Sequence, residues 1–258
     1  MAPLIAQVEA LLLELLASLS PEDWNRPTIV PGWTVHHIAA HLLDGALRKV
    51  AIIRDGHITQ TPQGDFVAFL NKLNADGVAV YARLSPRQLL QHLQLASAEF
   101  CAFHTALDPA APAAFPVSWA GESQSTNAFD TARELTERWH HQQQIRLATN
   151  NPNLAHAVPV LDTLLRALPH RYRAVDAPAG TTLQIETAGA VWALCKQDHW
   201  HLSAAASPSP HTTIHIPTEI AWRLFTKGIS PEAARAQSRI DGDTQLSEPF
   251  FSTLAIIG

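Results

Sequence analysis

Two groups of polar residues recur at helical spacing and could bind a metal ion. The first group follows steps of four, three and four residues: His37, His41, Asp44 and Arg48. The second group keeps steps of three or four: Asp130, Glu134, Glu137, His141 and Gln144. Residues at these spacings share one side of a helix, with about 5 to 6 Å between their Cβ atoms. Imidazole and carboxylate groups at that distance can share a divalent cation.

Both groups also permit a plainer interpretation. Each one lies opposite the apolar face of its own segment, where the solvent-exposed surface of an amphipathic helix would lie. Two polar faces on neighbouring helices can instead meet and enclose a metal site. Spacing alone favours the solvent-exposed interpretation, and both stay open at this point.

The first half of the chain is predicted to be helical. Apolar residues recur at three- and four-residue intervals, which indicates amphipathic helices. The predicted helices cover residues 4–18, 34–54, 66–83, 85–106 and 128–147. Thr34 can cap the second of them, and Asn127 with Asp130 resembles a capping box for the last. Long helices joined by short breaks are typical of a bundle.

The pattern changes after Asn150-Asn151-Pro152. One helix over 158–168 precedes alternating segments that are typical of strands. Strands are predicted over 181–186, 190–196, 199–204, 212–216 and 238–241. Thr218 and Ser230 could begin short helices between the last two strands, and another helix ends the chain. We therefore predict a helical domain over 1–151 and a small α+β domain over 152–258.

Composition excludes several classes of protein. The chain has 18 Lys plus Arg against 23 Asp plus Glu, a formal net charge of −5, which disfavours a nucleic-acid partner. Cys101 and Cys195 stand far apart with no CxxC spacing, so neither a disulfide framework nor a thiolate zinc site is expected. Glu9 and Glu14 interrupt the first apolar segment, which therefore suits neither a membrane span nor a signal peptide. We expect a cytoplasmic protein with no membrane partner.

Two motifs resemble those of the mycothiol-dependent maleylpyruvate isomerase family. The first is Ile-Val-Pro-Gly-Trp-Thr-Val at 29–35, continuing through Ala-Ala-His-Leu at 39–42. The second is Glu-Arg-Trp-His-His-Gln-Gln-Gln-Ile-Arg at 137–146, a glutamate followed four residues later by a histidine. The resemblance implies an N-terminal DinB-like four-helix bundle that binds metal, followed by a small α+β domain similar to sterol carrier proteins.

The resemblance also implies His41, Glu137 and His141 as the metal ligands. Two imidazoles and a carboxylate suit Zn²⁺ or a related divalent ion, and three protein ligands leave coordination positions open, as in catalytic sites. His140 is the adjacent alternative, but it points about 100° around the helix from His141 and is expected at the surface or an interface.

Two positions depart from the family pattern. His37 stands where relatives more often have an acid that completes a capping box, so we expect a weaker cap, with a fourth metal ligand as the alternative role. Gln144 stands where relatives tend to have Asp, and it could accept a hydrogen bond from a ligand histidine without supplying charge. Trp33, within the first motif, is expected in the core or as a wall of the site.

The implied activity needs a low-molecular-weight thiol, mycothiol or an equivalent, held as a thiolate by the metal. An isomerase of this type adds the thiolate to a cis double bond of a small electrophilic substrate similar to maleylpyruvate, and elimination then returns the trans isomer. An S-transferase is equally compatible with the ligands. Arg223, in the segment 218–228 that is similar to a family segment, is the candidate for binding a substrate carboxylate, with a surface or salt-bridge role as the alternative. A metal-dependent hydrolase and a non-catalytic metal- or ligand-binding protein remain the other hypotheses.

Overall fold

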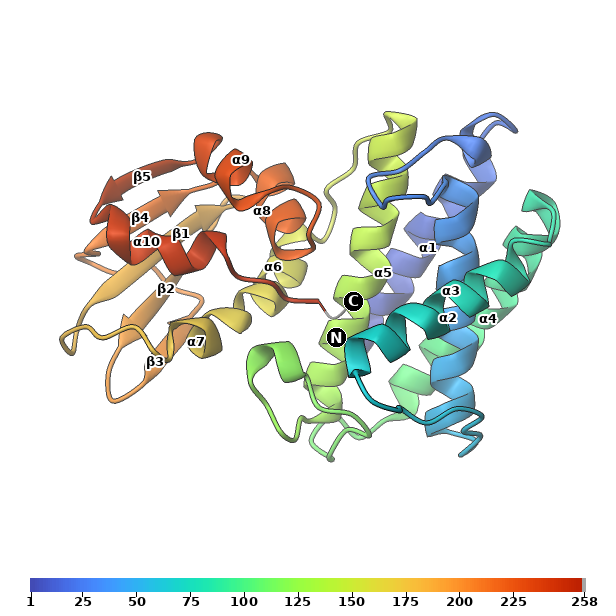
Figure 1. Cartoon of the computed structure of the whole chain (residues 1–258), viewed down its shortest axis with the longest axis horizontal. Helices are drawn as coiled ribbons and strands as arrows, with labels where there is room; N and C mark the ends of the chain where they lie inside the picture. Colours follow the sequence, from blue (N-terminus) through green and yellow to red (C-terminus); the bar gives the residue numbers. More distant parts are fainter. Residues whose placement is uncertain (257–258) are drawn as a thin grey trace. The chain divides into compact units, whose positions relative to one another are not determined.

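The computed structural model describes residues 1–256, which form two compact units (Figure 1). The bundle unit contains Met1–Phe115 and Thr126–Ala155, and the sheet unit contains Pro116–Ser125 and His156–Ile256. A helical N-terminal region is thus followed by a mixed α+β region, as the sequence predicts.

Four long helices and one additional helix build the described part of the bundle unit (Figure 1). They are α1 (Ala2–Ser18), α2 (Val35–Ile53), α3 (Phe66–Tyr81), α4 (Pro86–Ala106) and α5 (Asn127–Thr149). Helix α1 contacts α4 and α5, and α2 contacts the same two helices, so these four close a ring around the core. Helix α3 packs against the outer side of this ring through α2. The apolar side chains that face the ring interior are removed from water, and this burial stabilises the bundle.

The caps of α2 and α5 differ from the predictions. At the start of α2, the Thr34 side chain accepts from the His37 amide, and the Thr34 amide donates to Nδ1 of His37 at 3.1 Å. The capping box is therefore complete, and the expectation of a weakened cap is wrong, because an imidazole nitrogen can accept this hydrogen bond as a carboxylate would. Helix α5 is capped by Thr126, which accepts from the Phe129 amide at 3.3 Å, whereas Asn127 is already helical.

A five-stranded sheet forms the core of the sheet unit. Its strands are β1 (Thr182–Thr187), β2 (Ala190–Lys196), β3 (Trp200–Ser203), β4 (Thr212–His215) and β5 (Arg239–Gly242), in the order β3-β2-β1-β4-β5. Strands β1 and β4 are parallel, and the other pairs are antiparallel. Alternate side chains on one face, including Leu183, Ile185 and Ile214, are fully buried, as expected where a sheet covers a core on that face.

The helices of the sheet unit are shorter than those of the bundle unit. They are α6 (Ala157–Leu165), α7 (Ala167–Tyr172), α8 (Thr218–Phe225), α9 (Pro231–Ala236) and α10 (Thr244–Phe251). The single helix predicted over 158–168 is divided at Arg166 into α6 and α7. Thr218 is the first residue of α8 rather than its cap, which is Pro217 and makes no side-chain capping bond.

The connection from α4 to α5 contributes a segment to the sheet unit. Within Pro116–Ser125, the short 3₁₀ helix η2 (Ser118–Ala120) packs against α7. Gly121 follows it with φ +82°, and a Cβ atom at this position would lie 2.1 Å from Nδ1 of His170. Glycine is needed here for both the backbone conformation and the close approach.

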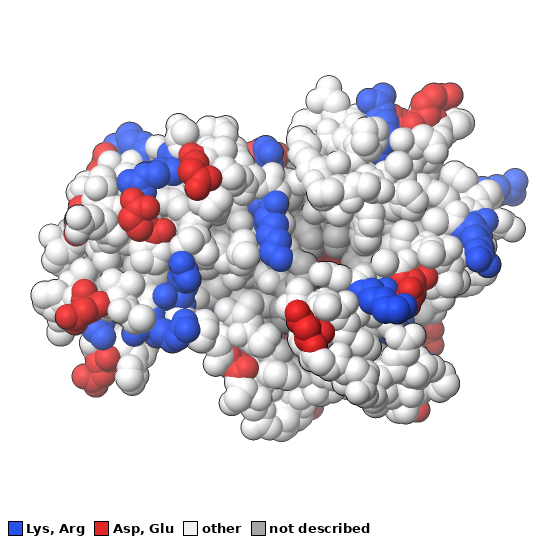
Figure 2. All heavy atoms as spheres, viewed as in Figure 1, with Lys and Arg blue, Asp and Glu red and all other residues white. Residues whose placement is uncertain are grey.

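The described surface carries few charged residues on the face drawn in Figure 2, where Lys and Arg are interspersed with Asp and Glu rather than gathered in one basic field. Among residues 1–256, no helix has the combined length and apolar character that crossing a membrane requires. The absence of a nucleic-acid partner stays a prediction.

Candidate metal centre

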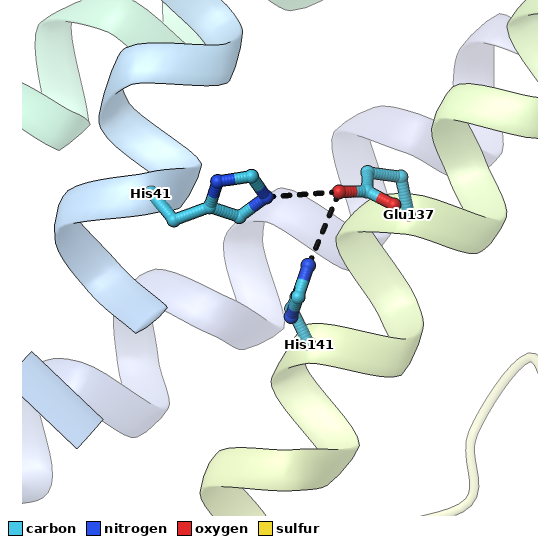
Figure 3. Close-up of side chains that lie close together, drawn as sticks. All are labelled: His41, Glu137 and His141. Carbon is cyan, nitrogen blue, oxygen red and sulfur yellow. Dashed lines mark hydrogen bonds and ion pairs between the residues drawn. The ribbon is translucent and has the colours of Figure 1, made fainter. Parts of the chain in front are cut away.

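Three potential metal ligands meet between α2 and α5. His41 extends from α2 toward Glu137 and His141, which project from α5 (Figure 3). Oε1 of Glu137 lies 3.0 Å from Nε2 of His41 and 3.1 Å from Nε2 of His141. One ligand atom from each residue lies within 4.8 Å of the other two. This is a spacing at which one divalent cation can contact all three.

Gln144 determines which nitrogen of His141 faces this cluster. Its side-chain oxygen lies 2.7 Å from Nδ1 of His141, and because an amide oxygen can only accept, Nδ1 carries the proton. In the neutral ring Nε2 then holds a lone pair, directed at the Glu137 carboxylate. Two acceptors this close repel each other unless a proton or a cation lies between them. The donor set therefore fits a metal ion, and the predicted contact of Gln144 with a candidate ligand histidine, His141, is present.

The charges at the cluster suit metal binding at neutral pH. Burial lowers the pKa of His41, and the hydrogen bond from Nε2 of His41 to the Glu137 carboxylate offsets this only in part. Burial alone would raise the pKa of Glu137, but the favourable interactions of its carboxylate with His141, His41 and His140 hold this pKa well below its ordinary value. A neutral imidazole and an ionised carboxylate are the protonation states in which these groups bind metals.

His41 is held by ring packing rather than by a second hydrogen bond. Its Nδ1 is buried and has no hydrogen-bond partner among residues 1–256. The centre of the Trp33 ring lies 5.2 Å from that of the His41 ring. The His141 ring packs edge-to-face against the His41 ring, with 4.7 Å between the ring centres. Trp33 thus forms a wall beside the ligand, one of the two roles expected for it.

Comparison with known proteins identifies the family of the N-terminal helical region, which carries the three-residue cluster. The family described as mycothiol maleylpyruvate isomerase N-terminal domain matches residues 5–146, more than half of the chain. The chain belongs to this family. Among curated proteins, none matches the sequence significantly.

Two solved structures share the fold of the family. A crystal structure of the mycothiol-dependent maleylpyruvate isomerase is 14% identical, with a TM-score of 0.53 over 86% of this chain and 86% of that chain. A structure of a mutant of that isomerase has the same identity and coverage and a TM-score of 0.50. At this identity the likeness shows the fold, a helical N-terminal region followed by a sheet with helices.

His140 of the second family motif is not a surface residue, which corrects the prediction. Only 3% of it is exposed, and its Nδ1 lies 3.0 Å from the backbone oxygen of Thr136. Its ring packs 4.1 Å from the His141 ring, centre to centre, and burial lowers the pKa of His140 to about 3. His140 therefore packs as a neutral ring against His141 and is not part of the three-residue cluster.

The two polar groups of α2 and α5 meet at the contacts among His41, Glu137 and His141, so the fully solvent-exposed interpretation is wrong for the two histidines, whereas the Glu137 side chain stays 38% exposed. Nζ of Lys49 lies 2.7 Å from Asp130 and 3.0 Å from Glu134, and Asp130 is only 1% exposed. Asp130 also pairs with Arg133. The sequence analysis did not predict Lys49 as the ion-pair partner of Asp130 and Glu134. The only indication of its burial in the sequence is its position beside Val50, which lies on the apolar face of the same helix.

Outside the three-residue cluster, the other candidate residues have structural partners. His37 holds the cap of α2, as described above. Arg223 of α8 directs Nε and Nη2 to the backbone oxygen of Gly228, each at 3.2 Å, beyond the end of its helix. Cys101 is half-buried, and burial raises the pKa of its thiol to about 11, so it is an unreactive thiol at neutral pH. The catalytic role of Arg223 stays a prediction.

Proposed function

We propose that the chain is a metal- and thiol-dependent enzyme, an isomerase acting on a small electrophilic substrate similar to maleylpyruvate. Two solved structures with this fold, one of them of a mutant, are of the mycothiol-dependent maleylpyruvate isomerase by name. The observation that carries the proposal is the cluster of His41, Glu137 and His141, whose ligand atoms lie within 4.8 Å of one another. An S-transferase would use the same ligand set and is the second form of the proposal.

The three ligands suit Zn²⁺, because two imidazoles and one carboxylate are a frequent catalytic zinc set with a position left open. When bound, a divalent metal supplies the positive charge that keeps a coordinating thiol deprotonated at neutral pH. The chain's own residues prepare the site for it. Gln144 keeps the His141 proton on Nδ1, Trp33 covers one side of His41, and His140 packs beside His141.

The remaining parts of the proposal concern the substrate, the thiol and the compartment. Mycothiol or an equivalent low-molecular-weight thiol is the proposed cofactor. Arg223 is proposed to bind a substrate carboxylate, since a guanidinium can grip a carboxylate through two parallel hydrogen bonds. The two free cysteines suit a reducing compartment such as the cytoplasm.

Metal content tests the site directly. The purified full chain should hold close to one divalent metal, measured by elemental analysis, and His41→Ala and His141→Ala should each lose it. The matched control is His37→Gln, which changes a histidine of α2 that caps the helix. Full metal content in both ligand variants would overturn the proposed site.

Turnover separates the proposed chemistry from its alternatives. Isomerisation of maleylpyruvate should need both Zn²⁺ and mycothiol, and it should stop when either is withheld. Hydrolysis of esters or amides without thiol would replace the proposal by a metal-dependent hydrolase. Metal binding with neither activity would leave a non-catalytic metal-binding protein.

A further inference from the structure

A buried charged contact joins the four long helices of the bundle unit. Arg138 of α5 and Glu9 of α1 are each only 2% exposed. Nη2 of Arg138 donates to Oε2 of Glu9 at 2.7 Å, and Nε donates to Oε1. The hydroxyl of Ser97, on α4, donates to the same carboxylate. Nη1 of Arg138 donates to the backbone oxygen of Leu42, on α2, at 2.5 Å.

This Arg138 network, consisting of Glu9, Leu42, Ser97 and Arg138, lies next to the metal ligands in the sequence of both helices. Arg138 directly follows Glu137, and Leu42 directly follows His41. Neighbouring side chains of a helix point about 100° apart, so Arg138 and Glu137 point in different directions from the same turn of α5, while Leu42 contributes its backbone carbonyl. The guanidinium also lies 5.3 Å from the centre of the Phe100 ring, which holds it from another side.

The ligand set depends on how α2 sits against α5, because His41 comes from one helix and both other ligands from the other. Helix α2 packs mostly against α3 and α4, however, and α5 packs mostly against α1. A shift of α2 by a single residue would move His41 about 1.5 Å along the helix axis. Metal–ligand distances tolerate about 0.2 Å, so this alignment must be fixed by specific contacts.

We propose that Arg138 is a positioning residue for the metal site: by binding the Glu9 carboxylate and the Leu42 carbonyl together, it sets the alignment of α2 with α5. This rests on the proposed metal-dependent function. The carboxylate fixes the direction of the guanidinium, and the guanidinium then holds the backbone of α2 at the residue that follows His41. A lysine could not replace it, because one ammonium group does not present the same planar set of donors.

A purely structural role makes a different prediction from a positioning role. Removing one partner of a buried ion pair leaves an uncompensated charge, so Arg138→Met should destabilise the chain in either case. Replacing both partners by apolar residues removes the buried charges and recovers stability. The contact with Leu42 is absent in both variants. The double variant Glu9→Met/Arg138→Met therefore separates stability from alignment.

The experiment measures Zn²⁺ affinity of the full chain by competition with a chromophoric chelator, together with urea unfolding of the metal-free chain. We expect the double variant to be more stable than Arg138→Met, yet to bind Zn²⁺ about 10- to 100-fold more weakly than the wild type. Arg138→Lys should lose affinity similarly. Leu89→Ala, a truncation of a buried residue of α4 outside the network, should lose stability without losing affinity. Wild-type affinity in the double variant would overturn the positioning role.

Amide hydrogen exchange of the metal-free chain gives a second readout that does not need the metal. Amides of α2 around Leu42 and of α5 around Arg138 should exchange faster in the double variant than in Leu89→Ala, when the two variants are compared under conditions that give them the same free energy of unfolding. Equal exchange in these two variants would overturn the proposed alignment. A wild-type chain that binds no Zn²⁺ would instead overturn the proposed function, while the exchange data would still decide whether Arg138 aligns the helices.

Discussion

The side-chain oxygen of Gln144 accepts a hydrogen bond from Nδ1 of His141, one of the three proposed ligands. Gln144→Leu removes the acceptor while keeping a side chain of similar size. We expect Zn²⁺ affinity to fall about 10- to 100-fold, the usual range for the loss of such an outer partner. Gln144→Glu restores an acceptor and adds charge, so it should bind Zn²⁺ at least as well as the wild type. Chelator competition on the three proteins checks this, and equal affinities would contradict it.

Arg223 has two candidate roles that one substitution separates. Its guanidinium donates to the Gly228 carbonyl, and a lysine could also donate to this carbonyl. A lysine could not form the two parallel hydrogen bonds with which a guanidinium binds a carboxylate. If Arg223 binds substrate, Arg223→Lys should keep metal content and stability but lose about 10- to 100-fold in turnover, or roughly 1.4 to 2.7 kcal/mol of transition-state stabilisation. Wild-type turnover in this variant would leave Arg223 as a residue that fastens the end of α8.

The sequence predicts the candidate ligands better than it predicts their neighbours. Two motifs indicate His41, Glu137 and His141, and the structure brings these three residues together. The environment of His140 was predicted wrongly, because the spacing along one helix shows which way a residue points but not which other helices cover it. Glu9 and Arg138 lie far apart in the sequence, so no local pattern indicates that they meet.

At the scale of elements, most helices and strands could be predicted within a few residues from the three-to-four and two-residue periodicities of apolar side chains. The capping residue of α5 was missed because Thr126 and Asn127 are both good capping types. Only the backbone conformation distinguishes them. The break between α6 and α7 was missed although Pro169 marks it: a proline has no amide to donate to the carbonyl four residues earlier, that of Leu165, so a continuous helix is disfavoured there.

Helix α4 contributes a buried histidine that should make the stability of the bundle depend on pH. His104 packs against Phe100 and Phe103, and burial lowers its pKa to about 4. The unfolded chain takes up this proton near pH 6.5 and the folded chain only near pH 4. The stabilisation is therefore complete above about pH 6.5 and is lost as the pH falls toward 4, with a total on the order of 3 kcal/mol.

Urea unfolding between pH 7.5 and 4.5 checks this prediction. His104→Gln should be less stable at neutral pH, because the rings around it lose packing, but its free energy of unfolding should fall less steeply with decreasing pH. The exposed His92 of the same helix provides the control, since His92→Gln should keep the wild-type slope. The same slope in His104→Gln and the wild type would contradict the role of His104.

At the scale of the whole molecule, the two compact units suggest a division of labour that can be tested by truncation. All three proposed ligands belong to the bundle unit, so a fragment of residues 1–151 should stay helical and bind Zn²⁺, measured by circular dichroism and chelator competition. Turnover should be lost, because the proposed substrate-binding Arg223 lies in the sheet unit. Full activity of the fragment would contradict the proposed need for the second domain, residues 152–258, in turnover.

The sequence pattern places the change of architecture near residue 152, and the bundle unit ends at Ala155. It does not indicate that Pro116–Ser125 belongs with the second unit. The proline-rich composition around this segment predicts an irregular connection but says nothing about its partner. The decisive contact is that of η2 with α7, which are separated by more than forty residues of sequence.

The interleaving of the two units has a consequence for the order in which the protein can fold as it leaves the ribosome. All helices of the bundle emerge before α7 is made, so the bundle can close while the segment that carries η2 still has no surface to pack against. The close contact of Gly121 with His170 can therefore form only late, after α7 has been synthesised. The connection between α4 and α5 should therefore be the part of a nascent chain that a protease cuts most readily, and it should become resistant only after synthesis has passed the second unit.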